Sequence, residues 1–206
     1  MLDKDENKNS QWTKYYYPGT NVIFNNYGIK DYDKLKEAEA TNSFRRLLEL
    51  QKEPINMNFN KYHLNEINKR LFEDIYPFAG KYRDVNMPER YGDFLEIREP
   101  QDIGRHLDQL LEEIEKELMV VTNKTDFSGL LSKMYVNLME CHPFREGNGR
   151  TIREFIREYS IVKSEELGLG NLELDWSKID KENLNENNII KSFEDALVSS
   201  ESIKNK

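Results

Sequence analysis

The chain has 206 residues and a mass of 24.5 kDa, the size of one domain with its own hydrophobic core. Its 11% aromatic content argues against disorder, its 10 Gly and 6 Pro exclude collagen-like architectures, and its single cysteine excludes an internal disulfide framework. A net charge of -8 argues against direct nucleic acid binding, and the lack of a long apolar run or apolar leader predicts a cytoplasmic protein that contacts no membrane.

The first part of the chain predicts a tip, an arm and two helices. Residues 1–14 are charged and rich in Asn, so we expect a flexible tip, followed by an arm that packs aromatic side chains such as Tyr17 on the body. Apolar residues at helical spacing predict a helix over about 33–50. A second helix is predicted from Asn60, a suitable N-cap, to the stop at Pro77.

The pattern changes between residues 81 and 97, where we predict the one β-hairpin of the chain. Two runs of strand-forming residues flank the turn-rich segment 88–93. On this pattern alone, the hairpin would be a simple cover on the core.

The second half of the chain predicts four more helices and a flexible tail at residues 199–206. The helices are expected over about 101–121, from Asp126 as N-cap to the stop at Pro143, over 150–167 and over 186–198. The fold class predicted from these elements is all-α, a helical bundle with one small β-hairpin.

The segment from His142 to Arg153 concentrates chemical groups at the junction of two predicted helices. Gly147-Asn148-Gly149 leaves backbone N–H groups open at a helix N-terminus, where free donors and the helix dipole favour anions. Glu146 beside them is a hard oxygen ligand that suits Mg²⁺ bridging phosphates. The imidazole of His142, with an ordinary pKa of about 6.5, suits a general base acting on a hydroxyl.

Three arginines follow on the second of these helices. At ~100° per residue, Arg150, Arg153 and Arg157 share one face, and guanidinium groups there would complete a phosphate site. The alternative is a solvated face on which the arginines pair with Glu154 and Glu158. Each feature taken singly favours this alternative, and their coincidence favours the phosphate site.

The twelve residues from His142 to Arg153 match, at every defined position, the signature His-x-Phe-x-Asp/Glu-Gly-Asn-Gly-Arg-x-x-Arg of the Fic family. The stretch Leu71 to Lys81 resembles the family's segment before its hairpin flap, and Tyr17-Pro18-Gly19 resembles the start of stand-alone Fic toxins. The resemblance spans about residues 15–198 and implies a Fic domain there, with a flap over about 83–97.

The resemblance implies a protein adenylyltransferase, which moves AMP from ATP to a hydroxyl of a target protein. By this resemblance His142 is the base, Phe144 anchors the loop and Glu146 holds Mg²⁺. The phosphates would lie on Gly147, Asn148 and Gly149, with Arg150 at the α- and β-phosphates and Arg153 at the γ-phosphate. The flap would dock a target segment by strand addition, and we place that contact on Arg83, Val85, Gly92, Phe94 and Ile97.

The resemblance also implies partners. Similar stand-alone toxins modify a tyrosine in the ATPase subunits of DNA gyrase and topoisomerase IV, and this target is favoured because no C-terminal delivery domain is recognised. No Ser/Thr-x-x-x-Glu-Gly/Asn inhibitory motif occurs in the chain, so we expect it on a separate small antitoxin whose glutamate pairs with Arg153.

Other functions stay open at this point. The protein could be an effector that modifies host GTPases, or a nucleotide-binding interaction module without chemistry, although pure binding needs neither His142 nor Glu146. A metal-dependent nuclease is disfavoured by the net charge of -8, and no P-loop or Rossmann glycine motif occurs. His63 and His106 are predicted to be structural or surface residues, and Cys141 a buried thiol.

Overall fold

The computed structural model describes residues 11–56, 58–86 and 99–200, and the fold is mostly helical, as predicted. The α-helices are α1 (Tyr32–Lys52), α2 (Lys61–Phe72), α3 (Ile103–Leu118), α4 (Lys124–Cys141), α5 (Asn148–Glu166) and α6 (Ile189–Ala196). Short 3-10 helices are η2 (Gln11–Tyr15), η3 (Pro100–Asp102) and η4 (Trp176–Lys178).

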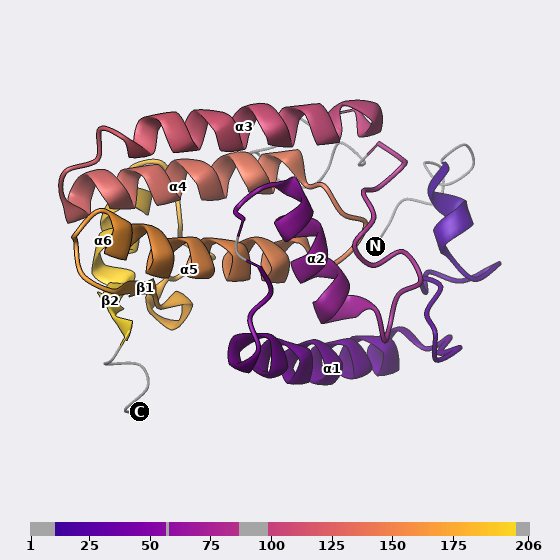
Figure 1. Ribbon diagram of the computed structural model, residues 1–206. Helices are drawn as coiled ribbons and strands as arrows, with labels where there is room; N and C mark the ends of the chain where they lie inside the picture. The colour runs from indigo at the N-terminus through magenta and orange to yellow at the C-terminus, as the bar shows by residue number, and fades with distance from the viewer. Residues whose placement is uncertain (1–10, 57, 87–98, 201–206) are drawn as a thin grey trace.

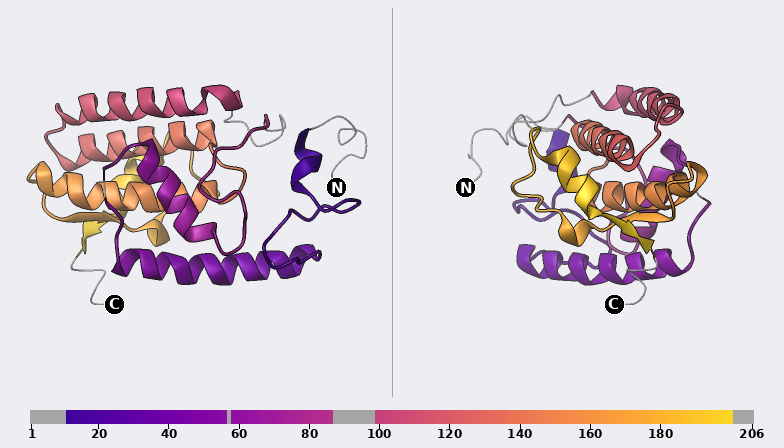
Figure 2. Two further views of the ribbon diagram at one scale, coloured as in Figure 1. Left: turned by 45° about the vertical axis from the view of Figure 1, so that its right-hand side comes forward. Right: turned by 90° about the vertical axis from the view of Figure 1, so that its left-hand side faces the viewer.

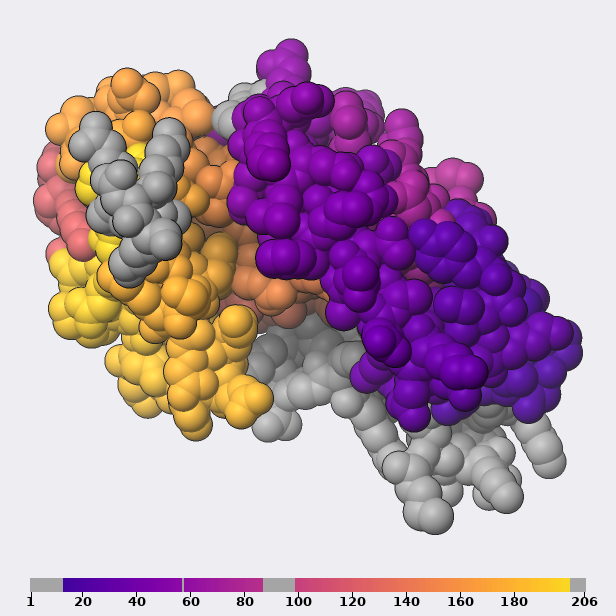
Figure 3. Space-filling view, turned by 90° about the horizontal axis from the view of Figure 1, so that it is seen from below, coloured from indigo at the N-terminus to yellow at the C-terminus, as the bar shows by residue number. Residues whose placement is uncertain are grey.

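The helices form a bundle around α4 and α5. Figure 1 shows α3 and α4 side by side along the top, α5 beneath α4, α2 crossing α5, and α1 along the bottom. The second view in Figure 2 shows α6 packed against α4 at the opposite end from the N-terminal arm. Figure 3 shows the bundle from below, where α1 and the arm cover one side. No helix in the described ranges is both long and apolar enough to span a bilayer.

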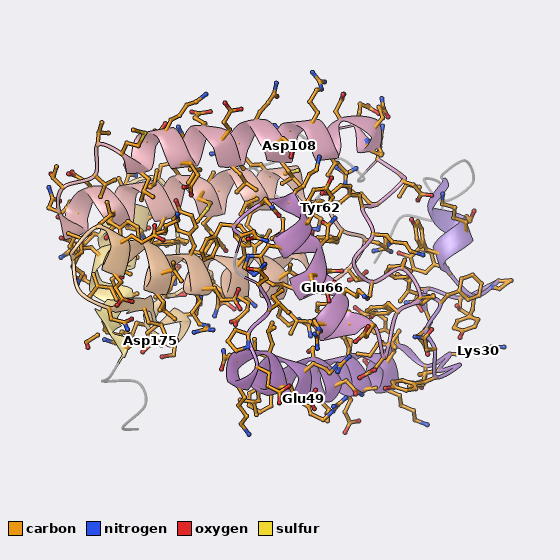
Figure 4. All side chains as sticks on the ribbon, in the orientation of Figure 1. Lys30, Glu49, Tyr62, Glu66, Asp108 and Asp175 are labelled. Atoms are coloured by element: carbon orange, nitrogen blue, oxygen red, sulfur yellow. The ribbon has the colours of Figure 1, made fainter. Side chains whose placement is uncertain are left out.

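Regular apolar stripes produce this packing. The Leu and Ile residues that recur at helical spacing in α2, α3 and α4 are buried, for example Ile67, Ile114 and Leu131. The α1 helix differs, because Phe44 is 62% exposed and Leu48 is 43% exposed. This helix contacts α2 at the edge of the bundle and therefore buries only a narrow face. A salt bridge of 2.6 Å from Lys61 to Asp108 joins the start of α2 to α3. Figure 4 labels Asp108 on α3 and Tyr62 on the first turn of α2.

The α4 helix begins three residues earlier than predicted. Asn123, and not Asp126, is its N-cap, with Oδ1 accepting from the backbone N–H of Asp126 at 2.9 Å. Asp126 completes the cap from the first turn, since its carboxylate accepts from the Asn123 side-chain amide at 2.7 Å. The prediction of Asp126 as the cap was wrong because Asn and Asp both cap helices, so residue type alone does not decide between them. The hydrogen bonds between the two residues show that Asn123 is the cap and that Asp126 lies in the first turn.

Replacing Asn123 with alanine is expected to destabilise the fold by about 1 kcal/mol, because the first-turn N–H groups of α4 lose their acceptor. Thermal unfolding should then move down by about 2–4 °C. Asn123→Asp keeps an acceptor at the same position and is expected to stay close to the parent protein. Equal melting temperatures for Asn123→Ala and the parent would contradict this cap.

The structure describes one sheet that was not predicted. A two-stranded antiparallel sheet joins β1 (Leu172–Leu174) to β2 (Leu197–Ser199), with Leu174 opposite Leu197. The helix predicted over 186–198 therefore ends at Ala196, where Leu197 turns into a strand and stays buried at 2% exposure. Three-residue strands are too short to show alternation in sequence. Most of the predicted hairpin, including Gly92, Phe94 and Ile97, lies outside the described residues.

Both ends of the chain were expected to be flexible. The tip was expected over residues 1–14; at its end Gln11–Tyr15 forms a 3-10 helix, and Lys14 pairs with Asp84 at 2.5 Å. The tail was expected over residues 199–206; at its start Ser199 ends β2, and the buried Ser200 donates its N–H to the Asn171 carbonyl at 3.0 Å. Residues 1–10 and 201–206 lie outside the described residues.

Candidate functional site

The motif loop begins at His142, where α4 ends. The His142 N–H donates to the Leu138 carbonyl at 3.1 Å, and the backbone then enters the left-handed region with φ of 43° and ψ of 60°. This conformation costs a residue with a side chain about 1–2 kcal/mol. The surrounding contacts must therefore hold His142 in place, as is common for strained residues at functional sites.

Asn148 holds the loop from its other end. Its Oδ1 accepts from the Phe144 N–H at 2.8 Å, and its Nδ2 donates to the Phe144 carbonyl at 2.7 Å. Both residues are buried, so this side chain satisfies backbone groups that water cannot reach. The sequence placed both at the site, Asn148 on phosphate and Phe144 as an anchor. In the structure the Asn148 side chain binds the Phe144 backbone, so the phosphate contact expected of Asn148 falls to its backbone N–H.

The start of α5 is a helix N-terminus without a side-chain cap. Gly147 is the N-cap, with φ of 81°, and has no side chain to accept a hydrogen bond from the first turn. The N–H groups of Asn148, Gly149 and Arg150 have no partner within a helix at these positions. A Cβ on Gly147 would lie 2.2 Å from the Phe72 ring, so glycine is needed for close approach as well as for backbone conformation. Such a terminus favours an anion.

The three arginines do not line one common site. Arg150 donates to Glu39 and Ser43 of α1, with its guanidinium 4.8 Å from the Phe72 ring centre. Arg157 is bound at 2.8 Å by Glu154 and by Glu173 of β1. The predicted common face therefore divides, because acidic residues on α1, β1 and α5 itself take up two of the three charges.

Arg153 is the arginine that remains at the α5 N-terminus. Its Nη1 would lie 3.1 Å from a Cβ on Gly149, so the guanidinium lies against the first turn. Burial lowers its pKa, and the neighbouring charge of Arg150 acts in the same direction, whereas Tyr135 opposes them. Within the described ranges no carboxylate pairs with this guanidinium. A partly buried, uncompensated cation beside free N–H donors is suited to a phosphate.

His142 is tuned toward its neutral form. The pKa of its imidazole is lowered from 6.5 to about 4, chiefly by burial and then by the charges of Arg83 and Arg145, while a hydrogen bond with the Met139 backbone opposes the shift. A general base must be unprotonated to accept a proton. The site therefore holds His142 ready to act as a base at neutral pH.

An NMR titration of the free protein is expected to show His142 titrating at about pH 4 rather than 6.5. Because the unfolded chain binds this proton first as the pH falls, the stability contributed by neutral His142 is complete above pH 6.5 and is lost between 6.5 and 4. Loss of the signal in His142→Ala assigns it. A midpoint near 6.5 for that signal would contradict the burial of the imidazole.

Glu146 lies between the loop and the α5 N-terminus. Burial raises the pKa of its carboxyl, and the Arg145 guanidinium, 2.5 Å from Oε1, opposes that shift. Residues 11–56, 58–86 and 99–200 contain no group of three or more His, Cys, Asp or Glu side chains arranged to hold a metal. A cation at Glu146 would thus take one protein carboxylate and complete its shell with phosphate oxygens and water, as Mg²⁺ does.

Two residues of the site were not identified from the sequence. Arg145, 6% exposed, donates to Glu146 and at 2.6 Å to the Tyr16 hydroxyl of the arm. Asn68 of α2 donates to the Glu146 carbonyl at 3.2 Å and accepts from the Gly80 N–H at 2.8 Å. Arg145 occupies an undefined position of the signature and Asn68 is an ordinary helix residue, so no local pattern could have identified either.

The start of the flap is fixed to the motif loop. Tyr82 forms a β-bridge with Phe144, and the Arg83 N–H donates to the Pro143 carbonyl at 2.8 Å. Arg83 and Val85, which we expected to face a docked target, are each 1% exposed. These two side chains therefore belong to the support of the loop, while the other expected docking residues lie outside the described ranges.

The fold and site define a helical domain with an anion-binding helix N-terminus next to a neutral histidine. A family model described as Fic/DOC family matches residues 58–160, half of the chain. The chain belongs to the Fic/DOC family.

Relatives and solved structures agree with this assignment. The chain is 30% identical over 89% of its length to protein adenylyltransferase VbhT of Bartonella schoenbuchensis, of which it spans 36%. It is 28% identical to the probable protein adenylyltransferase Fic of Escherichia coli, covering 84% of this chain and 82% of that protein. The structure of BepC from Bartonella tribocorum, with bound AMPPNP, superposes with a TM-score of 0.74 at 25% identity, over 91% of this chain and 98% of that one.

Proposed function

We propose that the protein is an adenylyltransferase that transfers AMP from ATP to a hydroxyl side chain of a target protein. The hydroxyl oxygen attacks the α-phosphorus while the bond to the oxygen bridging the α- and β-phosphates breaks, and pyrophosphate leaves. The hydroxyl proton passes to the unprotonated ring nitrogen of His142. Positioning and charge neutralisation supply most of the rate in such reactions.

One observation carries the proposal: one short segment joins a neutral His142 to the α5 N-terminus, and the Arg153 guanidinium lies against the first turn of that helix. The double hydrogen bond from Asn148 to Phe144 fixes the two ends of that loop relative to each other. Binding of phosphate would require only the helix end. The half-buried imidazole kept unprotonated supports chemistry on a hydroxyl as well. The names of the relatives and the nucleotide in the BepC structure support the same activity.

Mg²⁺ is proposed as the cofactor, with Glu146 as its protein ligand. The lone carboxylate fits an ion that is held mainly by ATP phosphates and water. When bound, Mg²⁺ would neutralise charge on the phosphates. Arg145, now paired with Glu146, sets the orientation of that carboxylate.

ATP labelled at the α-phosphorus tests the activity. Incubation with Mg²⁺ and a bacterial lysate is expected to label a protein band, and His142→Ala is expected to reduce the labelling rate at least about 100-fold. ATP affinity in the variant should stay within about twofold of the parent, because His142 does not hold the phosphates. ATP labelled at the γ-phosphorus is the matched control and should give no band that depends on the added protein.

The outcomes separate the candidate functions. Label from the γ-phosphorus would indicate a kinase and contradict AMP transfer. ATP binding without any labelled protein would indicate an interaction module. Equal labelling by the parent and His142→Ala would remove His142 from the reaction.

We further propose, from the family resemblance, a cytoplasmic toxin that modifies the ATPase subunits of DNA gyrase and topoisomerase IV, held inactive by a small antitoxin. Arg153 supports inhibition by an antitoxin, because no carboxylate among the described residues pairs with its guanidinium. An antitoxin glutamate could therefore bind it. Purified subunits replacing the lysate test the target, and a labelled GTPase instead would identify a host-directed effector. If Arg153→Ala leaves inhibition by a cognate antitoxin undiminished, the pairing is wrong.

A further inference from the structure

Arg83 is a fully buried arginine that ends on backbone carbonyls next to the proposed base. The residue is 1% exposed and lies among the largest buried side chains of the described chain. Its Nε donates to the His142 carbonyl at 2.8 Å, its Nη1 to the Val85 carbonyl at 2.9 Å and its Nη2 to the Cys141 carbonyl at 3.3 Å. One guanidinium thus binds the last residue of α4, the residue after it and the start of the flap.

This location has two physical consequences for the end of α4. The final carbonyls of a helix lack intrahelical donors and carry the negative end of its dipole, so a cation there is stabilising. The guanidinium fork also fixes the orientation of the peptide units on which it acts, because its N–H groups diverge in one plane. His142 leaves the helix in the left-handed region, and its carbonyl is one of the groups that Arg83 holds.

The charge of Arg83 acts on the His142 ring as well. Two cations influence that ring, Arg83 from the flap and Arg145 from the loop, and both favour the neutral imidazole. The Met139 backbone in the last turn of α4 acts in the opposite direction. Arg83 is therefore both a mechanical support and an electrostatic partner of His142.

We propose that Arg83 is a positioning residue for His142, which holds the residue in its left-handed turn through the two carbonyls at the end of α4 and so fixes the orientation of the imidazole. The expected fall in kcat rests on the proposed function, whereas the expected effect on the orientation and pKa of His142 does not. It extends the active site to the base of the flap, outside the signature.

The test compares Arg83→Met, which removes the charge and the fork, with Arg83→Lys, which keeps the charge alone. In Arg83→Met the NMR pKa of His142 is expected to rise by about one unit, kcat for AMP transfer to fall at least about tenfold, and ATP affinity to stay within twofold. Arg83→Lys is expected to keep the His142 pKa nearer the parent value while kcat still falls, because one ammonium cannot replace the fork.

Arg157→Met is the matched control. Arg157 is an arginine with a largely buried side chain, but its partners are the carboxylates of Glu154 and Glu173 and not the carbonyls at the end of α4. Its loss should lower the melting temperature and leave the pKa of His142 unchanged. If Arg83→Met does not fold, Arg83→Lys decides by the fall in its kcat at constant ATP affinity.

The proposal is overturned if the His142 pKa and kcat of Arg83→Met equal those of the parent, or if both change as much in Arg157→Met. Full activity of Arg83→Lys would show that charge alone suffices and would overturn the positioning role. If the parent labels no protein, the proposed function fails, and the shift of the His142 signal in Arg83→Met still decides whether Arg83 controls that residue.

Discussion

Gly147→Ala is expected to destabilise the protein by about 3 kcal/mol and to reduce AMP transfer at least tenfold, the first figure combining overpacking with a positive φ. The new methyl would lie 2.2 Å from Cε2 and 2.5 Å from Cζ of Phe72. Phe72 cannot move aside, since it is 1% exposed in the core and lies beneath the Arg150 guanidinium. The start of α5 must therefore shift, and with it the anion site.

Gly168→Ala provides the matched control. Gly168 has φ of 69°, similar to the 81° of Gly147, but a methyl there would meet nothing within 4 Å. It should cost only the conformational part, about 1 kcal/mol, with activity preserved. Chemical denaturation of the two variants gives the comparison. Equal losses of stability would show that the close approach of Phe72 contributes nothing.

His63→Leu is expected to destabilise the fold by about 3 kcal/mol at pH 8, because it leaves the Glu158 carboxyl buried without its partner. His63 Nε2 of α2 and Glu158 Oε2 of α5 are 2.8 Å apart, with side chains 1% and 0% exposed. Burial raises the pKa of Glu158, while His63 lowers it. Removing His63 therefore raises that pKa further.

Comparison of His63→Leu with the double variant His63→Leu/Glu158→Leu measures what the unpaired Glu158 carboxyl costs in stability. A carboxyl with a raised pKa binds its proton more tightly in the folded state, so its cost to stability is largest at high pH and shrinks as the pH falls. The double variant should be more stable than His63→Leu at pH 8, and the two should converge toward pH 5. A constant difference between them across that range would contradict an ionised Glu158 in the core.

Much of the helical framework could be predicted, because it depends on local spacing. The buried stripe of α3 repeats at helical spacing from Ile103 to Leu118, and Asn60 caps α2 as expected, accepting from the N–H of His63 at 3.1 Å. The site's location was likewise readable, since His142 to Arg153 lies in one short segment. Such features need no knowledge of distant contacts.

The partners of the site residues could not be predicted, because they come from far along the chain. Glu39 reaches Arg150 from α1, Glu173 reaches Arg157 from β1, and Asn68 reaches the Glu146 carbonyl from α2. Helical periodicity places residues on faces but does not show which neighbour covers each face. The three arginines therefore looked equivalent in sequence and play different parts in the fold.

The N-terminal region supplies parts of the site that lie outside the family match at residues 58–160. Tyr16 binds Arg145, and Glu39 with Ser43 binds Arg150, so two side chains of the loop depend on residues before that range. A fragment cut at the edges of the family match would contain every signature residue, yet Arg150 would lose its acceptors on α1 and Arg145 would keep Glu146 but lose Tyr16. The stretch of chain that holds the motif in place is thus longer than the segment by which its family is recognised.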